Sequence, residues 1–473
     1  MSNTQKTAVV LGAGITGMTV AWKLSEAGYK VHVIEKTDKV GGMAGSFSYK
    51  DMVLDYGPHK VYTQLPGILD VYKEIVGEDL LRIKKKNSLR LLGRYFDFPV
   101  KIFQVMLGLG IGTALKCGLG YGFTLLKSFF SKKKLISYED YFLAGFGKPA
   151  YNLLFRDYAW KVWGDPKSLS EELARKRIPV PNIFELVKGT LGIKPKTEVS
   201  AEYFYYPKKG IGNISEILAE RLLKNHGEIH FHTVPEQIYV ENGKVTHLVV
   251  SDIEKKSQKT LKTDIVVSTI YVTELPALLQ PAAPQTVLDA AMRLHFRAMI
   301  IVYVVVKKPK LMEDNWLFFP EQTFIFNRIA EHKSFSNELV PADKTVLTAE
   351  VTCTPDDEIW KMPEKELYAQ VVQDLTKAGI LNPSDIEECF SKRMKKVYPI
   401  YAIGFKDHLM TILDHLQGVS NLLTLGRQGL FNYNNTDHCI DMALKAAEHI
   451  IGHHSPEEWM EKIRYFDAYK IVD

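Results

Sequence analysis

A glycine-rich turn near the N-terminus constrains the fold of this chain more than any other feature. The run Gly12-Ala13-Gly14-Ile15-Thr16-Gly17 has the pattern GxGxxG. It follows an apolar run at 8–11, typical of a buried strand, and opens the segment 15–27, whose apolar residues recur at helical spacing. In this context the first glycine makes a tight turn, the second admits a pyrophosphate to the backbone, and the third allows close helix packing. The segment is predicted to bind a dinucleotide at a helix N-terminus.

A carboxylate at the end of the next predicted strand completes the motif. Residues 30–35 alternate between polar and apolar types and end at Glu35. A carboxylate there can accept hydrogen bonds from a ribose hydroxyl and would repel a 2′-phosphate. The first part of the predicted cofactor site is therefore Gly12, Gly14, Ile15, Thr16, Gly17 and Glu35.

A second glycine-rich run follows directly. Glu35-Lys36 and Gly41-Gly42-Met43-Ala44 form an E-K-x4-G-G pattern, which resembles the second diphosphate-contacting loop of the glutathione-reductase-type FAD fold. A nicotinamide enzyme does not need such a loop, so the resemblance favours FAD over NAD. No His or Cys falls in a recognised attachment motif, so we expect the FAD to be non-covalent. The fold class is predicted to be α/β, with a Rossmann FAD-binding domain of this type.

Length and composition exclude several other classes. A chain of 473 residues exceeds what one core usually organises, so more than one lobe is expected. The formal charge of +5 is small and gives no argument for nucleic acid. The four cysteines lie far apart without metal-ligand spacing, and His453-His454 has no partner at such spacing, so we expect no metal. Widely spaced thiols and a polar N-terminus predict a cytoplasmic protein without a signal peptide.

The strand and helix patterns predict intergrown domains. The FAD-binding domain is assigned to the ranges 1–65, 200–275 and 406–473. The segment 66–199 lacks strong strand signals and is predicted to be a helical insertion or substrate lobe. The segment 276–405 is predicted to be an α+β substrate domain with a sheet, because it contains β-rich runs at 298–306, 316–328 and 345–352.

Beyond these motifs, the chain resembles the superfamily of flavin amine oxidases, protoporphyrinogen oxidases and phytoene desaturases. Val234 and the segment 264–269 resemble its adenine-side segment and its second nucleotide-domain strand. Leu425-Gly426-Arg427-Gln428-Gly429 resembles the loop that lies along ribityl and flavin. The resemblance implies that Val234, Gly426 and Arg427 belong to the cofactor site.

Shorter matches resemble UDP-galactopyranose mutase, a branch of the same fold in which reduced FAD acts as a nucleophile without net redox change. Asp55-Tyr56-Gly57-Pro58-His59 resembles its flavin-flanking turn, and the segment 158–164 its K-x-W-G segment. The segment 328–333 resembles its R-I-x-E-H-K run, and Arg297 falls near another of its arginines.

Two positions depart from the mutase pattern. Pro181 stands where an arginine is expected to bind the nucleotide-sugar phosphate. Of an expected tyrosine pair only Tyr433 is present, with Thr436 in the other place. These changes remove a phosphate clamp and an aromatic hydroxyl but leave the FAD site intact.

We therefore expect an FAD-dependent oxidoreductase, similar to protoporphyrinogen oxidase or amine oxidase. It would oxidise a C–N or C–C bond of a fairly apolar small molecule by hydride transfer to the flavin. The alternative is a mutase-like, non-redox flavoenzyme that acts on a nucleotide sugar. A flavoprotein fold used only for binding or regulation is a third class.

Individual residues are assigned roles in this site. We expect Pro58 and His59 to lie against the flavin ring, Arg328 to line the substrate cavity, and Arg427 to stabilise anionic reduced flavin. A satisfied turn histidine and a surface salt bridge are the competing interpretations of His59 and Arg427. Asn435 and Asp437 could hydrogen-bond cofactor hydroxyls or cap the final helix. Five aromatic residues are expected either to form the wall of an apolar substrate cavity or to belong to an ordinary core: Trp160, Trp163, Tyr203, Phe204 and Tyr205.

The segment 105–134 combines an apolar, glycine-rich stretch with lysines. Lys116 and Lys127 interrupt it, and a central lysine costs about 2.5–3.5 kcal/mol on membrane insertion, so a span is not expected. One hypothesis is peripheral contact with the cytoplasmic face of a membrane, with Lys132–Lys134 and Lys84–Lys86 meeting anionic head groups. The other is a buried helix pair that roofs the active site.

Overall fold

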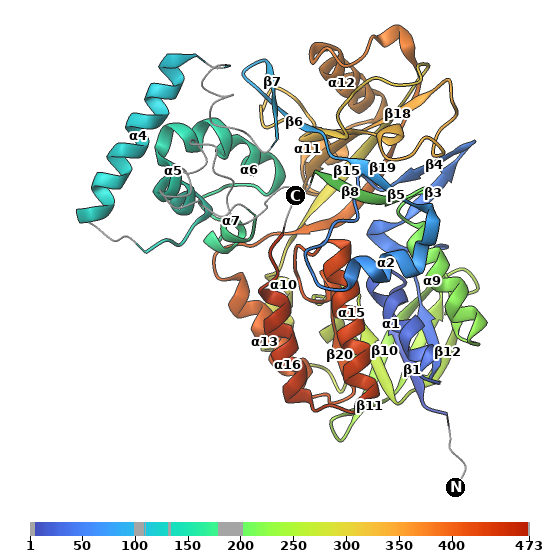
Figure 1. Cartoon of the computed structure of the whole chain (residues 1–473). Coiled ribbons are helices and arrows are strands. Elements are labelled where there is room, and N and C mark those ends of the chain that lie inside the picture. The colour runs from blue at the N-terminus through green and yellow to red at the C-terminus, as the bar shows by residue number, and fades with distance from the viewer. Residues whose placement is uncertain (1–4, 99–107, 109, 131–133, 178–201, 472–473) are drawn as a thin grey trace. The chain divides into compact units, whose positions relative to one another are not determined.

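The computed structural model describes residues 5–98, 108, 110–130, 134–177 and 202–471 (Figure 1). The chain forms two compact units, each assembled from separate stretches of sequence. Unit 1 comprises residues 1–81, 205–295 and 405–469, and unit 2 comprises residues 82–204, 296–404 and 470–473. Unit 1 extends past the predicted borders at 65 and 275, because α2 (Ile68–Val76) packs on α9 (Asn213–Lys224) and α10 (Gln285–Met292) on α13 (Phe405–Gln417).

Unit 1 is organised by a five-stranded parallel sheet in the order β20-β13-β1-β2-β9. Its strands are β1 (Thr7–Leu11), β2 (Lys30–Ile34), β9 (Glu228–His230), β13 (Ile265–Ser268) and β20 (Leu422–Thr424). Short apolar strands joined by helices favour this arrangement, because both faces of a parallel sheet are covered. The predicted α/β class and Rossmann start are confirmed.

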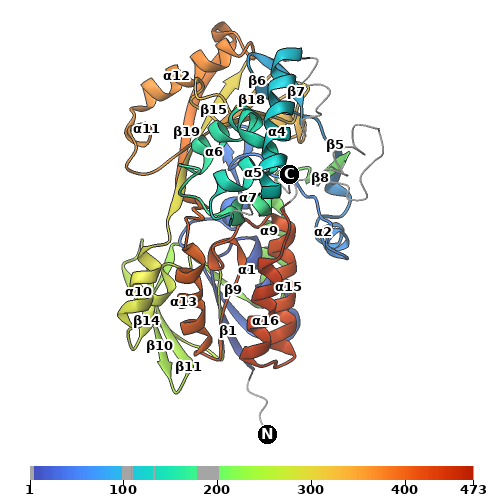
Figure 2. The same cartoon turned by 90° about the vertical axis from the view of Figure 1, so that its left-hand side faces the viewer.

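Helices from both ends of the chain pack together in unit 1. The first helix α1 (Ile15–Glu26) lies against α15 (Thr436–Ile451), and α15 also contacts α16 (Pro456–Asp467), as Figure 2 shows. Almost every residue of α1 is buried, which explains its continuous run of small and apolar side chains. The sequence prediction of a helix after Gly14 and another near Asp437 is confirmed.

Unit 1 also contains smaller β elements. A four-stranded sheet has the order β12-β11-β10-β14, with β10 (Thr233–Glu241), β11 (Lys244–Asp252), β12 (Ser257–Lys262) and β14 (Leu279–Gln280). Asn242 and Gly243, both at positive φ, form the tight turn between β10 and β11. A hairpin of β3 (Ser46–Tyr49) and β4 (Met52–Asp55) was not predicted.

Unit 2 is built on a seven-stranded sheet in the order β19-β15-β18-β17-β16-β6-β7. The strands are β6 (Asn87–Leu91), β7 (Arg94–Asp97), β15 (Phe296–Val306), β16 (Trp316–Phe318), β17 (Arg328–Glu331), β18 (Thr345–Cys353) and β19 (Ile386–Pro399). Its core joins the apolar faces of β15 and β18 to Leu367, Val371 and Leu375 of α12 (Glu364–Lys377). The short helix α11 (Glu358–Lys361) precedes α12. The predicted sheet in this part of the chain is confirmed.

The helical lobe of unit 2 is more mixed than predicted. Its helices are α4 (Ile111–Phe130), α5 (Tyr138–Leu154), α6 (Arg156–Val162) and α7 (Glu171–Arg177). The expectation that 66–199 has no strong strand is wrong, because β5 (Leu80–Lys84), β6 and β7 lie within it. The strand at residues 87–91 was not predicted because four of its five side chains are buried. Such burial removes the polar-apolar alternation that marks a strand.

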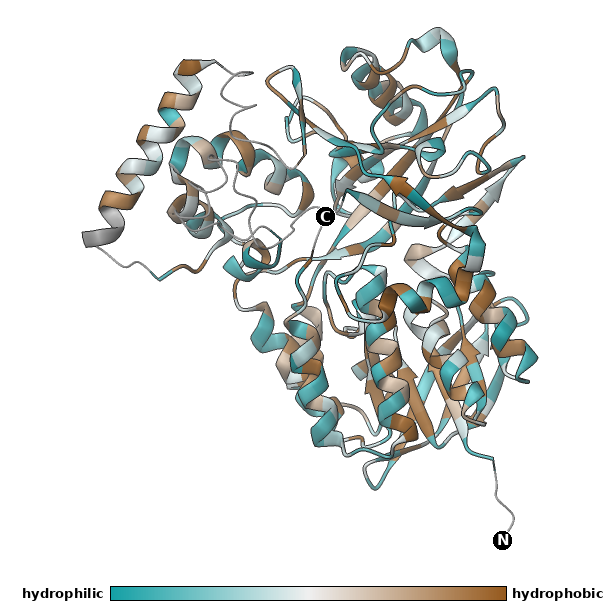
Figure 3. Cartoon of the chain, viewed as in Figure 1, coloured by the Kyte–Doolittle hydropathy of each residue, from teal (hydrophilic) through white to brown (hydrophobic). Residues whose placement is uncertain are grey.

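Helix α4 packs closely on α5. A Cβ added to Gly120 would lie 2.5 Å from Cδ of Pro149, so glycine is what allows this approach. The opposite face carries exposed apolar side chains. Figure 3 colours the hydrophobic residues of α4 brown along the ribbon. None of the helices in the described ranges is sufficiently long and apolar to cross a bilayer.

Candidate functional site

The glycine loop of unit 1 connects β1 to α1. Gly12 has a φ of 97°, and its amide donates to the carbonyl oxygen of Ile34 at 2.8 Å. A Cβ on Gly17 would lie 2.0 Å from the carbonyl oxygen of Gly12, so this glycine allows α1 to pack on the loop. A Cβ on Gly14 would meet no described atom within 4 Å. The loop therefore packs tightly at Gly17 and leaves space beside Gly14. This arrangement lets a diphosphate approach the amides of Ile15 and Thr16.

Glu35 lies at the carboxyl end of β2, directly beside this loop. The side chain is 8% exposed, and its Oε2 accepts from the amide of Ala13 at 2.8 Å. Its Oε1 accepts from the amide and hydroxyl of Thr37 at 2.9 and 2.8 Å. Oε1 already accepts two hydrogen bonds, whereas Oε2 accepts one and has a further lone pair, so Glu35 can fix the loop and still accept from a ribose hydroxyl. Thr233 donates its amide to the carbonyl oxygen of Glu35 at 2.9 Å, which places neighbouring Val234 at this edge.

The second glycine run lies against the first. Gly41 donates its amide to the carbonyl oxygen of Ala13 at 2.8 Å, and a Cβ on Gly42 would lie 3.2 Å from Cα of Gly14. Lys36 begins this connection, and its ammonium group lies 6.0 Å from the ring centroid of Tyr271. The predicted diphosphate residues Gly14, Gly41, Gly42, Met43 and Ala44 thus come from two adjoining loops.

The C-terminal glycine turn reaches the same edge of the sheet. Gly426, at a φ of 84°, begins α14 (Gly426–Gly429), and a Cβ there would lie 2.9 Å from Oγ1 of Thr16. Gln428 donates to Sδ of Met43 at 2.9 Å. Arg427 donates to the carbonyl oxygen of Asn434 at 2.9 Å and lies 5.6 Å from the ring centroid of Tyr433. The structure therefore brings both ends of the chain to the predicted cofactor site.

Buried polar atoms at this edge are suited to a polar cofactor. Within the described part of the chain, Ser268 Oγ and Gln428 Oε1 are buried without a hydrogen-bond partner. Buried polar groups ordinarily find a partner, and the hydroxyls and ring nitrogens of FAD would supply one. Burial raises the pKa of Asp437. Asn435 is the N-cap residue of α15, so its capping role is observed, whereas a cofactor contact stays a prediction.

The turn that carries Pro58 and His59 is anchored by a buried acid. Asp55 Oδ1 accepts from the Ser46 hydroxyl at 2.6 Å, and Oδ2 accepts from the Tyr206 hydroxyl at 2.5 Å. Burial raises the pKa of Asp55 to about 6, although both hydrogen bonds act to lower it. Nδ1 of His59 donates to the carbonyl oxygen of Gly57 at 3.0 Å, so that in the neutral ring Nε2 is the acceptor atom.

Arg328 and Lys161 belong to unit 2. Both ends of the Arg328 guanidinium donate to Glu350, at 2.8 and 2.7 Å, in a bidentate ion pair. Lys161 donates to the carbonyl oxygens of Phe319, Glu321 and Phe326 at 2.8, 3.0 and 2.6 Å. Burial lowers the pKa of Lys161 to about 7. Pro181 lies outside the described residues.

The predicted aromatic wall divides into several environments. Trp163 is buried against Tyr138 and Tyr158, and Phe204 against Trp316 and Phe335, so these two are core residues.

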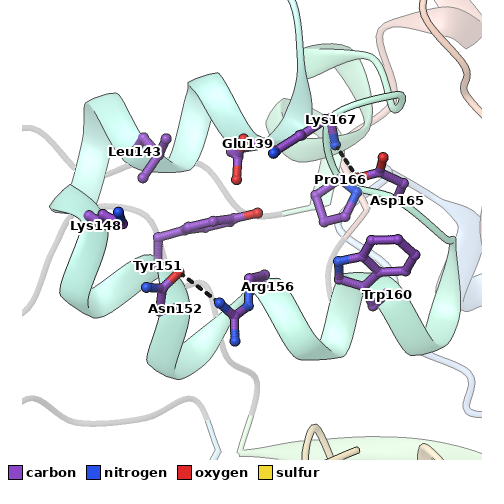
Figure 4. Close-up of a pocket in the computed structure, with 10 residues that line it drawn as sticks. All are labelled: Glu139, Leu143, Lys148, Tyr151, Asn152, Arg156, Trp160, Asp165, Pro166 and Lys167. Atoms are coloured by element: carbon purple, nitrogen blue, oxygen red, sulfur yellow. Dashed lines mark hydrogen bonds between the residues drawn. The ribbon is translucent and has the colours of Figure 1, made fainter.

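Trp160 instead borders a pocket of about 480 Å³ within the helical lobe (Figure 4). Most of the side chains around that pocket are charged or carry an amide, including Glu139, Arg156 and Asp165. Such a lining does not match the apolar cavity expected beside a flavin.

Sequence reasoning missed the partners that hold the predicted residues in place. Ser46, Asp55 and Tyr206 form the anchor of the His59 turn, and Glu350 pairs with Arg328. The sequence pointed to Asp55, since this residue begins the matched Asp-Tyr-Gly-Pro-His run. It did not point to Tyr206 or Glu350, because their contacts depend on segments far apart in the chain.

Comparisons with known proteins agree with this geometry. Residues 10–75 match the family model of the NAD(P)-binding Rossmann-like domain. Residues 120–392, more than half of the chain, match the model of flavin containing amine oxidoreductases.

Curated relatives fall into both predicted branches. The chain is 26% identical over 355 residues to a 1-hydroxycarotenoid 3,4-desaturase of Flavobacterium sp. (strain P99-3), covering 70% of each chain. It is 26% identical over 183 residues to a probable UDP-galactopyranose mutase of Klebsiella pneumoniae, covering 37% of this chain and 45% of the relative. The aligned region thus spans less than half of that relative's length.

Solved structures share the fold over nearly the whole chain. A reduced UDP-galactopyranose mutase gives a TM-score of 0.83 at 20% identity, covering 99% of this chain and 100% of the other. A protein assigned as a protoporphyrinogen oxidase from Exiguobacterium sp. 255-15 gives 0.72 at 20% identity, covering 96% and 100%. A putrescine oxidase gives 0.66 at 14% identity, covering 95% and 99%. At these identities the likeness concerns the fold alone.

Proposed function

Because the chain belongs to the flavin containing amine oxidoreductases, we propose that it oxidises a C–N or C–C bond of a fairly apolar small molecule by hydride transfer to non-covalent FAD. The observation that carries the proposal is the cradle in unit 1, where the Gly14 loop, Glu35 and the Gly426 turn meet at one edge of the parallel sheet. When bound there, FAD supplies the hydride acceptor. The residues of the chain bind it, orient it and set its electrostatic surroundings.

Each part of the cradle has a task that its chemistry supports. The amides of Ile15 and Thr16 at the start of α1 bind the diphosphate, and the positive end of the helix dipole favours its charge. Glu35 accepts from the adenosine ribose. The guanidinium of Arg427 stabilises negative charge that develops on the flavin as it accepts the hydride.

Two contacts favour redox chemistry over a nucleotide-sugar mutase. Thr436 stands where a tyrosine is expected and therefore supplies no phenol. Its side chain is buried, and its hydroxyl accepts from the Tyr72 hydroxyl at 2.7 Å. Arg328 is neutralised by Glu350, which weakens its attraction for a diphosphate substrate. Neither contact opposes an apolar substrate.

A non-redox mutase is the second candidate. The likeness of fold to reduced UDP-galactopyranose mutase over almost the whole chain favours it, as does the Arg-Ile-Ala-Glu-His-Lys run that begins at Arg328. The two candidates differ in what reduces the flavin. In the oxidoreductase the substrate itself reduces it, whereas the mutase needs flavin that is already reduced before the substrate binds.

Anaerobic titration separates the candidates. The oxidised holoenzyme is mixed without oxygen with a hydroxylated carotenoid, with an alkyl polyamine and with UDP-galactopyranose, and flavin absorbance is followed. Bleaching by the carotenoid or the amine alone supports the oxidoreductase. Conversion of UDP-galactopyranose only after dithionite reduction, with no bleaching by the other two, supports the mutase and overturns the first proposal.

We also propose that α4 contacts the cytoplasmic face of an anionic membrane. Its exposed stripe consists of Ile111, Leu115, Leu119, Phe123 and Leu126, each at least 59% exposed among the described residues. The spacing of these residues places them along one side of the helix, opposite the face that packs on α5. Lys134 and Lys84–Lys86 would meet anionic head groups, and Lys132 and Lys133 lie outside the described residues. The exposure of the stripe opposes the buried helix pair expected as the alternative.

Co-sedimentation with liposomes tests the membrane proposal. The variant Leu115→Gln/Leu119→Gln/Phe123→Gln is compared with wild type on anionic and on neutral vesicles. The control Leu223→Gln/Met292→Gln removes exposed apolar residues elsewhere. We expect only the α4 variant to lose binding to anionic vesicles. Equal binding by all three proteins contradicts the proposal.

A further inference from the structure

A cluster of two imidazoles and a carboxylate lies on adjoining strands of unit 1. In the parallel pair β2 and β9, His32 is opposite Glu228 and Ile34 is opposite His230. Side chains alternate along a strand, so His32, Glu228 and His230 project from the same face of the sheet. His32 is buried, whereas Glu228 and His230 are partly exposed.

The distances within this cluster have the dimensions of a metal coordination shell. Nδ1 of His32 lies 3.1 Å from Nε2 of His230 and 3.4 Å from Oε2 of Glu228. The remaining edge, from Nε2 of His230 to Oε2 of Glu228, is 3.5 Å. Tetrahedral zinc with bonds of about 2.0–2.2 Å separates its ligand atoms by about 3.3–3.6 Å. All three edges lie close to this range.

We propose that His32, Glu228 and His230 bind one divalent transition metal ion, for which zinc best fits the donor set. Two imidazole nitrogens and one carboxylate oxygen are zinc ligands, and three protein ligands leave a fourth position for water. The partial exposure of Glu228 and His230 gives the ion a route from solvent. This site is separate from the flavin cradle and does not depend on the proposed function.

The neighbouring charges are compatible with such a site. Burial lowers the pKa of both His32 and His230, which keeps the imidazoles in the neutral form that binds metals. Partial burial acts to raise the pKa of Glu228, but His32, Lys30 and His230 lower it overall. Lys30 lies 3.5 Å from Oε1 of Glu228, on the oxygen that does not face the imidazoles. The positive charge of Lys259 also acts to lower the pKa of both His32 and His230, and it would repel the ion.

Metal binding here would fasten the edge strand to its neighbour. The ion would join β9 to β2, and the carbonyl oxygen of His230 accepts from the amide of Glu35 at 2.9 Å. Ligation would therefore stabilise the strand end that carries Glu35, because a ligand that binds only the folded chain raises its stability.

Metal titration of the full-length holoprotein, prepared without a polyhistidine tag, tests this inference. Zinc binding is measured by calorimetry, and cobalt absorption reports tetrahedral geometry. The variants are His230→Gln and the more exposed Glu228→Gln, which is expected to fold normally. His232→Asn is the matched control, because His232 lies just beyond the cluster at positive φ, where asparagine is tolerated.

We expect one zinc ion per wild-type chain, a cobalt spectrum of tetrahedral type, and an increase in Tm with zinc. Each cluster variant should weaken binding by at least about tenfold, as loss of a ligand or its support typically does, whereas His232→Asn should match wild type. The proposal is overturned if wild type binds no zinc, or if His230→Gln and Glu228→Gln bind it as tightly as wild type.

Discussion

Thr16 and Gly426 lie close together, although Thr16 lies in the first turn of α1 and Gly426 in the last part of the chain. A Cβ on Gly426 would come within 2.9 Å of the Thr16 hydroxyl oxygen and 3.2 Å of its Cβ. This contact fixes the C-terminal turn beside the N-terminal glycine loop. The proposed cofactor site therefore depends on both ends of the chain having folded together.

Replacing Gly426 by alanine should disturb this contact. The residue has a positive φ, which costs about 1–3 kcal/mol for a side chain that disfavours it, and the added methyl group would press on Thr16. We expect a lower Tm and weaker FAD binding. Gly28→Ala is the control, since Gly28 also has a positive φ but a Cβ there meets nothing described within 4 Å. Equal effects of the two substitutions on FAD binding would contradict this account.

Glu35→Gln should weaken FAD binding by about tenfold or more. The carboxylate accepts from Ala13 and Thr37, and glutamine would present an amide donor where only acceptors fit. Fluorescence titration of the apoprotein measures the effect. Binding of FMN, which lacks the adenosine ribose, should change much less, so an equal loss for FMN and FAD would argue against a ribose contact.

His59→Ala should shift the reduction potential of the flavin. The loss of a hydrogen bond worth about 1–1.5 kcal/mol corresponds to about 20–30 mV for a two-electron couple. Potentiometry of the holoenzyme provides the measurement, with the exposed His295→Ala as control. An unchanged spectrum together with an unchanged potential would leave His59 as a turn residue only.

The buried acid Asp55 should make stability depend on pH. Its pKa is raised from 3.8 to about 6 in the folded chain, so the native state binds a proton more tightly than the unfolded state. Stability contributed by this proton is present at low pH and is lost as the pH rises from about 4 to about 6, by about 3 kcal/mol at most.

Urea unfolding of wild type and Asp55→Asn at pH 4.5 and pH 7 checks this prediction. Asparagine stays neutral and retains an acceptor for Ser46. The variant should therefore gain stability relative to wild type between the two pH values. A difference between the proteins that is the same at both pH values would contradict the assigned role of Asp55.

The local motifs were predictable because their signals lie within short segments. The strand and turn around Gly14 and the carboxylate Glu35 each follow from neighbouring residue types, and the first helix follows from the apolar periodicity of 15–27. These elements also follow family patterns, which supplied the choice of FAD.

Contacts between distant segments were not predictable from a single sequence. His32 and His230 are 198 residues apart, and Tyr206 lies 151 residues from Asp55, so no local spacing reveals either pair. The expectation of no metal rests on spacing along the chain, a criterion that does not bear on residues as distant as His32 and His230. The strand β6 was missed for a related reason, since its burial depends on partners such as β16.

The central claim is that unit 1 binds FAD through loops from both ends of the chain. The most direct test identifies the cofactor released from purified protein by chromatography and titrates the apoprotein with FAD, FMN and NAD. We predict one FAD released per chain on mild denaturation, rebinding of FAD in preference to the other two, and loss of that binding in Gly14→Val. Release of FMN or NAD, or undiminished FAD binding by Gly14→Val, would contradict the claim.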